Sequence, residues 1–124
     1  MNASRLTVVT GGNRGIGGAL VQELQKRGAR DVVAASRASS ADALDLSSQR
    51  SITAFAERVA PRGVSLLVNN AGAMFADRQL TEDGFERTLA VNGLGPLLLT
   101  ELLAPISQRS WRSCTWHARG ARAE

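Results

Sequence analysis

Several residue types that carry enzyme chemistry are scarce or absent in this chain of 124 residues. Tyrosine does not occur, and cysteine, histidine and lysine are each present once, as Cys114, His117 and Lys26. One cysteine cannot form a disulfide within the chain, and one cysteine with one histidine supplies too few ligands for a structural zinc site. Without tyrosine, no phenol can serve as a proton donor in this chain.

Long hydrophobic runs are also missing. None approaches the roughly 20 apolar residues that cross a bilayer, and residues 1–10 pass into a strand-like segment without the pattern of a signal peptide. Hydrophobic residues make up 44% of the chain and charged residues 21%, which is typical of a globular domain. We therefore expect one domain, residues 1–106, located in the cytoplasm and not in a membrane.

The net charge of +4 is concentrated at the C-terminal end. Residues 1–108 hold 11 basic and 10 acidic side chains, whereas residues 109–124 hold four arginines against one glutamate. Four arginines without an ordered face are weak evidence for phosphate contacts, so we do not expect nucleic acid as a partner. Residues 107–124 lack strand or helix periodicity and predict an irregular, disordered basic tail. A frameshifted or mis-spliced end is our hypothesis for them, and a natural short variant is the alternative.

Strand-like and helix-like patterns alternate through the first hundred residues. Four β-prone runs predict strands at residues 6–10, 31–36, 43–46 and 64–69, and helical spacing predicts helices between Ile16 and Gly28, at 48–60 and at 81–103. This alternation predicts an α/β fold with a doubly wound parallel sheet, incomplete at about four strands. Only residues 37–42 separate the second and third runs, which is too short for a helical crossover. Either that connection is a loop or residues 43–46 are irregular chain.

A glycine-rich loop joins the first strand to the first helix, with the sequence Thr10-Gly11-Gly12-Asn13-Arg14-Gly15-Ile16-Gly17. Gly11 allows a tight turn, Gly15 lets backbone N–H groups approach phosphate oxygens, and Gly17 lets the helix pack against the strand. A pyrophosphate would then lie at the positive end of the helix dipole. A turn without a ligand is the alternative, but the strand-to-helix context favours dinucleotide binding.

Three motifs in this order resemble those of the short-chain dehydrogenase/reductase family. Thr10–Gly17 matches its T-G-x-x-x-G-x-G loop, Asp45-Leu46 its adenine-contacting pair, and Asn69-Asn70-Ala71-Gly72 its N-N-A-G motif. The resemblance extends from residue 5 to about 105. Within it, residues 91–100 resemble members of the family that act on carbonyls or retinoid-like alcohols. The resemblance implies a Rossmann-type sheet, a nicotinamide cofactor, and hydride transfer with a small carbonyl or alcohol substrate. The cofactor-binding residues it implies are Thr10, Gly11, Asn13, Arg14, Gly15, Ile16, Gly17, Arg37, Asp45, Leu46, Asn70, Ala71 and Gly72.

The choice of cofactor depends on Arg14 and Arg37. A carboxylate at the end of the second strand accepts a hydrogen bond from the ribose 2′-hydroxyl of NAD, whereas arginine binds the 2′-phosphate of NADP. Here that strand ends in Ser36-Arg37 without an acid. A basic residue in the glycine loop and another after the second strand resemble the family's phosphate-preferring pattern, so we expect NADP(H) in preference to NAD(H). Two solvated surface charges are the alternative.

The catalytic half of the resemblance is incomplete. Residues 91–100 resemble the helix that carries the family's active-site asparagine, so Asn92 is the candidate catalytic residue, with an ordinary polar helix position as the alternative. That helix, at 81–104, also implies a homo-oligomer. The family's Tyr-x-x-x-Lys pair has no counterpart here, and we find no fifth strand pattern after Pro105. We therefore expect little or no activity, exposed leucines at 97–103, and, as the alternative function, a non-catalytic dinucleotide-binding or interaction module.

Overall fold

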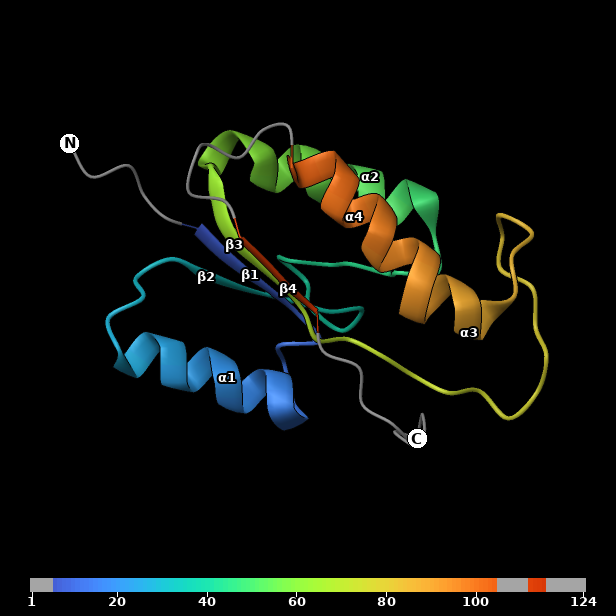
Figure 1. Ribbon diagram of the computed structural model, residues 1–124, viewed down its shortest axis with the longest axis horizontal. Coiled ribbons are helices and arrows are strands. Elements are labelled where there is room, and N and C mark those ends of the chain that lie inside the picture. The colour runs from blue at the N-terminus through green and yellow to red at the C-terminus, as the bar shows by residue number, and fades with distance from the viewer. Residues whose placement is uncertain (1–5, 105–111, 116–124) are drawn as a thin grey trace.

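The computed structural model describes residues 6–104 and, for backbone only, residues 112–115 (Figure 1). Its centre is a parallel sheet of strand order β2-β1-β3-β4. The strands are β1 (Leu6–Thr10), β2 (Val32–Ala35), β3 (Val64–Asn69) and β4 (Arg112–Thr115). All three neighbouring pairs are parallel. The predicted α/β fold with a Rossmann-like parallel sheet is therefore confirmed.

Helices cover both faces of this sheet. Helix α1 (Gly15–Lys26) lies on one face, and α2 (Gln49–Val59) and α4 (Gly95–Leu103) lie on the other (Figure 1). Because both faces are covered, all five residues of β1 are buried. The larger core lies between the sheet and α2 with α4, where Phe55, Leu67 and Leu99 have no exposed surface. Because helices cover both faces, a ligand could reach the sheet only at the strand ends.

The first two predicted helices are close to those observed. The apolar spacing that begins at Ile16 corresponds to α1, and the helix predicted at 48–60 is α2 followed by a 3₁₀ turn, η1 (Ala60–Arg62). Ser48 caps α2 by accepting a hydrogen bond from the backbone N–H of Ser51. Gly28 follows α1 with φ of +95°, as its expected place after the helix end requires.

The predicted strand at 43–46 is wrong. Only an isolated parallel bridge joins Ser36 to Ala43, and the N–H of Leu44 donates to the carbonyl of Ser36 at 3.0 Å. The connection of residues 37–42 is a loop, as its length requires, and it brings the chain back beside the end of β2 before α2 begins. Residues 43–46 are thus mostly irregular chain, which was the alternative interpretation.

The predicted helix at 81–103 begins later than expected. Residues 81–84 form a turn in which Gly84 has φ of +84°, and the helix starts with α3 (Arg87–Leu89). It continues through a π-helical segment, η2 (Ala90–Leu94), into α4. Of its leucines, Leu97 is 58% exposed, but Leu99 and Leu103 are buried against the sheet. The expectation that the whole leucine run is exposed is therefore wrong.

Strand β4 corrects the prediction of an irregular tail at the residues that it occupies. Its four residues pair in parallel with β3, in register from Leu66 with Arg112 to Asn69 with Thr115. A strand therefore follows Pro105 although no strand pattern was found there, and it pairs with β3. The rest of the predicted tail, and the boundary at residue 106, lie outside the described residues. Within the described part of the chain, no helix is long and apolar enough to span a membrane.

Candidate functional site

A groove of about 1130 Å³ lies at the carboxyl ends of β1, β2 and β3. The carboxyl edge of a doubly wound sheet is where such folds place ligands. All the residues that the sequence predicts for the site line this groove, except Gly17. They are Thr10, Gly11, Asn13, Arg14, Gly15, Ile16, Arg37, Asp45, Leu46, Asn70, Ala71, Gly72 and Asn92. The structure thus brings together segments from five parts of the chain, and their roles in binding stay predictions.

Thr10 joins the glycine loop to the loop after β3. Its buried hydroxyl accepts hydrogen bonds from the backbone N–H groups of Asn70 at 3.1 Å and Ala71 at 3.0 Å. It also donates to the carbonyl of Val68 at 3.4 Å. The side-chain amide of Asn70 donates in turn to the carbonyls of Thr10 at 3.1 Å and Gly11 at 3.4 Å. The two motifs therefore form one hydrogen-bonded unit at the floor of the groove.

Three glycines shape this floor in different ways. Gly11 and Gly15 have φ of +65° and +59°, values that residues with a side chain rarely adopt. A Cβ at Gly15 would meet no heavy atom within 4 Å, so the backbone there faces open space in the groove. A Cβ at Gly17 would lie 2.2 Å from the carbonyl oxygen of Gly11. Gly17 therefore lies behind the groove and allows α1 to pack against the loop.

Asp45 and Leu46 form the wall between the groove and α2. A carboxylate oxygen of Asp45 accepts hydrogen bonds from the N–H and hydroxyl of Ser47, at 2.9 and 2.6 Å. The N–H of Asp45 donates to the hydroxyl of Ser51 at 2.8 Å, which fixes this segment to α2. Leu46 is buried, and its carbonyl lies so close to Gly95 that a Cβ there would approach it to 2.3 Å. The wall is therefore hydrogen-bonded to α2 and packs closely against the first residue of α4.

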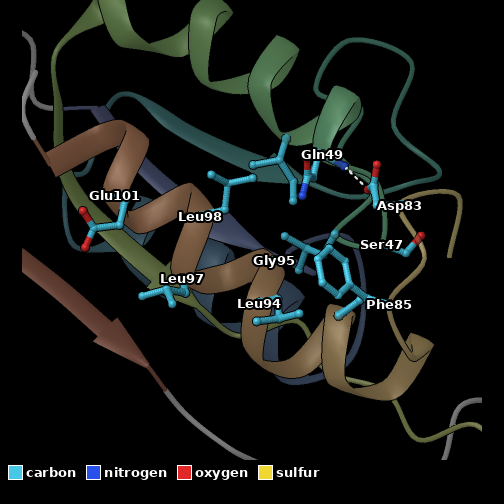
Figure 2. Close-up of a pocket in the computed structure, with 12 residues that line it drawn as sticks. Ser47, Gln49, Asp83, Phe85, Leu94, Gly95, Leu97, Leu98 and Glu101 are labelled. Carbon is cyan, nitrogen blue, oxygen red and sulfur yellow. Dashed lines mark hydrogen bonds between the residues drawn. The ribbon is translucent and has the colours of Figure 1, made fainter. Parts of the chain in front are cut away.

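A second cavity, of about 300 Å³, lies behind this wall between α2 and α4. Leu46 and Ser47 line both the cavity and the groove. Figure 2 shows Leu98 facing α2 and a hydrogen bond between the N–H of Gln49 and the carboxylate of Asp83, which measures 2.8 Å. This bond ties the turn at 81–85 to the start of α2. Most of the lining is apolar, so the cavity offers few groups for a charged ligand.

Asn69 and Asn92 anchor the elements beside the groove. The side-chain amide of Asn69, which is buried, donates to the hydroxyl of Thr100 at 3.2 Å and so connects β3 to α4. Asn92 lies in the π-helical segment. Its side-chain amide oxygen accepts a hydrogen bond from the N–H of Ala73 at 2.9 Å, and its side-chain NH₂ group donates to the backbone carbonyls of Ala73 and of Thr88. The side chain of Asn92 therefore holds the loop after β3, and its predicted catalytic role stays untested.

Arg14 lines the groove from the glycine loop after β1, and Arg37 lines it from the end of β2. Both are exposed, and neither forms an ion pair with a carboxylate of the described residues. Arg37 follows the end of β2, where the carbonyl of Ala35 accepts from the N–H of Gly11 at 2.8 Å. Two guanidinium groups are thus available in the groove to an anionic ligand.

The groove also contains residues that the sequence reasoning missed. Ala73, Met74 and Phe75 follow the N-N-A-G motif, and Arg87 and Val91 come from the helix. Two signals in the sequence could have indicated them. The first three follow the motif directly, and the other two lie within about one helical turn of Asn92. The guanidinium carbon of Arg87 lies 3.9 Å from the centre of the Phe75 ring, so these two segments also contact each other.

A parallel sheet, a glycine loop at the start of α1 and a groove at the carboxyl edge define a dinucleotide-binding α/β fold. The family model described as short chain dehydrogenase matches residues 5–111. The chain belongs to the short-chain dehydrogenase family, which confirms the resemblance seen in its motifs.

Individual relatives agree with this assignment. Retinol dehydrogenase 12 of Bos taurus is 43% identical over 119 residues, covering 80% of this chain and 38% of the relative. A putative short-chain dehydrogenase/reductase from Burkholderia multivorans, solved with bound NADP, matches with a TM-score of 0.73 at 26% identity. The match covers 93% of this chain and 59% of the Burkholderia multivorans chain. A short chain dehydrogenase from Burkholderia cenocepacia, in complex with NADP, matches with a TM-score of 0.73 at 28% identity, over 92% of this chain and 56% of the Burkholderia cenocepacia chain. The chain spans about two fifths of the length of the curated relative.

Proposed function

We propose that the groove binds NADP(H). The pyrophosphate would lie over the glycine loop, where Gly15 leaves the backbone accessible and α1 presents its positive end. Asp45 and Leu46 would contact the adenine, and the loop from Asn70 to Gly72 would lie beside the nicotinamide ribose. The dinucleotide would supply or accept a hydride when bound.

The observation that carries the choice of NADP(H) is the pair of arginines that follow β1 and β2. Arg14 and Arg37 line the groove without an ion-pair partner among the described residues. Residue 37 stands where NAD-binding folds have the carboxylate that accepts a hydrogen bond from the ribose 2′-hydroxyl. A guanidinium at this place instead matches a 2′-phosphate. The NADP-bound structures with the same fold add support from relatives.

The test compares the two cofactors on one variant. Arg37→Ala should weaken NADPH binding by roughly tenfold, as expected for a lost charge-assisted hydrogen bond, and should change NADH binding little. Fluorescence titration of each nucleotide measures both constants. Arg30→Ala is the matched control, because Arg30 is exposed and lies outside the groove. Equal losses for NADPH and NADH would overturn the assignment.

Hydride transfer between NADP(H) and a carbonyl or alcohol is the activity proposed for the complete protein. The sequence has no tyrosine to protonate a carbonyl oxygen, so we propose little or no turnover for this chain alone. A non-catalytic dinucleotide-binding or interaction module is the second candidate, favoured by that same absence. NADPH binding without oxidation by a panel of carbonyl compounds would support the module, whereas turnover would exclude it.

Two further proposals concern assembly and location. Leu97 is exposed on α4, and we propose that this helix mediates a homo-oligomer. Sedimentation of the chain and of Leu97→Gln tests this, since a polar residue at a subunit contact should shift the mass toward the monomer. We also propose a cytoplasmic location, which imaging of the tagged full-length protein would test.

A further inference from the structure

A third arginine, Arg87, lines the groove on the side of β3. Strand β1 lies between β2 and β3. Arg37 follows β2, whereas Arg87 contacts Phe75 of the loop after β3, so these two arginines lie on opposite sides of β1. Arg14 and Arg37 serve the phosphates in the proposed function. Arg87 instead contacts Phe75 of the loop after β3, which lines the groove together with Met74 and Asn92.

The guanidinium of Arg87 is held in place before any ligand binds. It stacks over the ring of Phe75, with its carbon 3.9 Å from the ring centre, and one of its nitrogens donates to the side-chain oxygen of Gln79 at 3.1 Å. The backbone N–H of Arg87 also donates to the carbonyl of Gln79, at 2.8 Å. A stacked guanidinium keeps its N–H groups in its own plane, at the edge, where an acceptor can reach them. Binding by such a group loses little side-chain entropy.

The charge of Arg87 has no acidic partner within the described residues. The side chain is half-buried, yet the ion pairs found there are Arg27 with Glu23 and Arg62 with Asp31. The adjacent carboxylate of Glu86 accepts hydrogen bonds from the backbone N–H groups of Thr88 and Leu89. The guanidinium is thus held by a ring and an amide and not by a carboxylate, so its charge remains available to an anion. The groove therefore has a place for a negative group on its β3 side.

We propose that Arg87 binds the carboxylate of the substrate, so that the complete protein acts on an oxo acid or a hydroxy acid. This inference rests on the proposed function for the hydride chemistry, but the anion site can be tested without it. Phe75 would set the plane of the guanidinium, and the two oxygens of a carboxylate match its N–H groups side by side. A purely structural role, holding the loop from Ala73 to Gln79, is the competing explanation. The backbone bond to Gln79 would still hold that loop if the charge were removed.

The experiment compares an acid with its neutral counterpart on the full chain. The probes are 4-oxopentanoate and methyl 4-oxopentanoate, titrated with and without NADP⁺ while backbone and arginine side-chain signals are followed by NMR. We expect the acid to bind wild type about fivefold more tightly than the ester, which is the scale of a partly exposed charge pair. Arg87→Gln should abolish this preference. Arg78→Gln is the matched control, since it removes the same charge at an exposed position outside the groove, in the loop that precedes α3.

Two more variants separate recognition from structure. Arg87→Lys keeps the charge but not the planar pair of N–H groups, so part of the acid preference should remain. Phe75→Leu keeps the guanidinium but removes the stacking, so the preference should fall while the ester affinity is unchanged. These variants decide the matter if Arg87→Gln does not fold. Equal binding of acid and ester to wild type, or an undiminished preference in Arg87→Gln, would overturn the inference.

The same samples separate this inference from the proposed function. NADPH fluorescence reports the dinucleotide site independently of the acid. If NADPH fails to bind while the Arg87-dependent acid preference persists, the proposed function is wrong and the anion site stands. If NADPH binds and the acid shows no preference, the anion site is wrong and the proposed function stands.

Discussion

The hydroxyl of Thr10, at the end of β1, accepts a hydrogen bond from the N–H of Asn70, at the end of β3, over 3.1 Å. The side-chain amide of Asn70 returns to the carbonyl of Thr10 at the same distance. These residues are sixty positions apart in the chain and belong to two separate motifs. The hydrogen bonds make the two loops a single floor beneath the groove, so a change in one loop should move the other.

Thr10→Val tests this coupling. Valine has nearly the same shape, but it leaves the N–H groups of Asn70 and Ala71 without their acceptor. The free energy of unfolding should fall by about 1–3 kcal/mol, the cost of buried polar groups that lose a partner. Urea unfolding followed by circular dichroism measures the loss. Thr10→Ser retains the hydroxyl and should lose less; equal losses would show that packing, and not hydrogen bonding, dominates at this position.

Two neighbouring glycines of α1 should respond in opposite directions to alanine. At Gly17 a Cβ would lie 2.2 Å from the carbonyl oxygen of Gly11, whereas at Gly18 the nearest atom would be 3.5 Å away. Gly17→Ala should therefore force the loop and helix apart and destabilise the fold by about 1–3 kcal/mol. Gly18→Ala should stabilise it by about 0.5–1 kcal/mol, because alanine favours the helix. Thermal unfolding of the two variants measures the difference, and a loss at Gly18 equal to that at Gly17 would contradict it.

Local sequence patterns predicted the strands that lie in the centre of the sheet. The β-prone runs at 6–10 and 64–69 coincide with β1 and β3, because strands covered on both faces are continuous apolar runs. Residues 43–46 have a similar pattern, since Leu44 and Leu46 are buried. Their apolar side chains enter the core from irregular chain, and periodicity alone does not distinguish that from a strand.

The features that the sequence did not predict correctly depend on contacts between residues distant in the chain. Strand β4 forms by pairing with β3, although residues 112–115 have no β-prone pattern of their own. The helix begins at Arg87 and not at Thr81 because Glu86 caps it and Gly84 turns the chain before it. The glycine loop and the N-N-A-G motif could be assigned to one site from the sequence, since both follow central strands. The contribution of Phe75 and Arg87 could not, because it depends on how the loop after β3 folds back onto the helix.

Asn92 should act as an anchor for the loop after β3. Asn92→Asp keeps an oxygen that can accept from the N–H of Ala73, but it removes the donor to the carbonyls of Ala73 and Thr88. The carboxylate would also face those carbonyl oxygens. We expect amide exchange in the loop from Ala73 to Gln79 to accelerate, with a loss of about 1–3 kcal/mol in stability. Hydrogen exchange by NMR measures the change, and Asn13→Asp, an exposed position, is the control. Unchanged exchange in the loop would contradict the anchoring role.

The cap at Glu86 should make the start of the helix sensitive to acid. The carboxylate of Glu86 accepts hydrogen bonds from the backbone N–H groups of Leu89 and Thr88, and these bonds hold the pKa of Glu86 below its ordinary value of 4.5. A carboxyl group with a lowered folded-state pKa stabilises the fold above its unfolded-state pKa, and this contribution is lost as the pH falls through the folded-state value. The amide signals of Thr88 and Leu89 should therefore shift together on acidification, at a pH below the ordinary glutamate range. NMR titration from neutral pH downward measures the midpoint. Glu86→Gln should remove the shift in both amides, and a midpoint at or above the ordinary glutamate value would show that these hydrogen bonds do not stabilise the carboxylate.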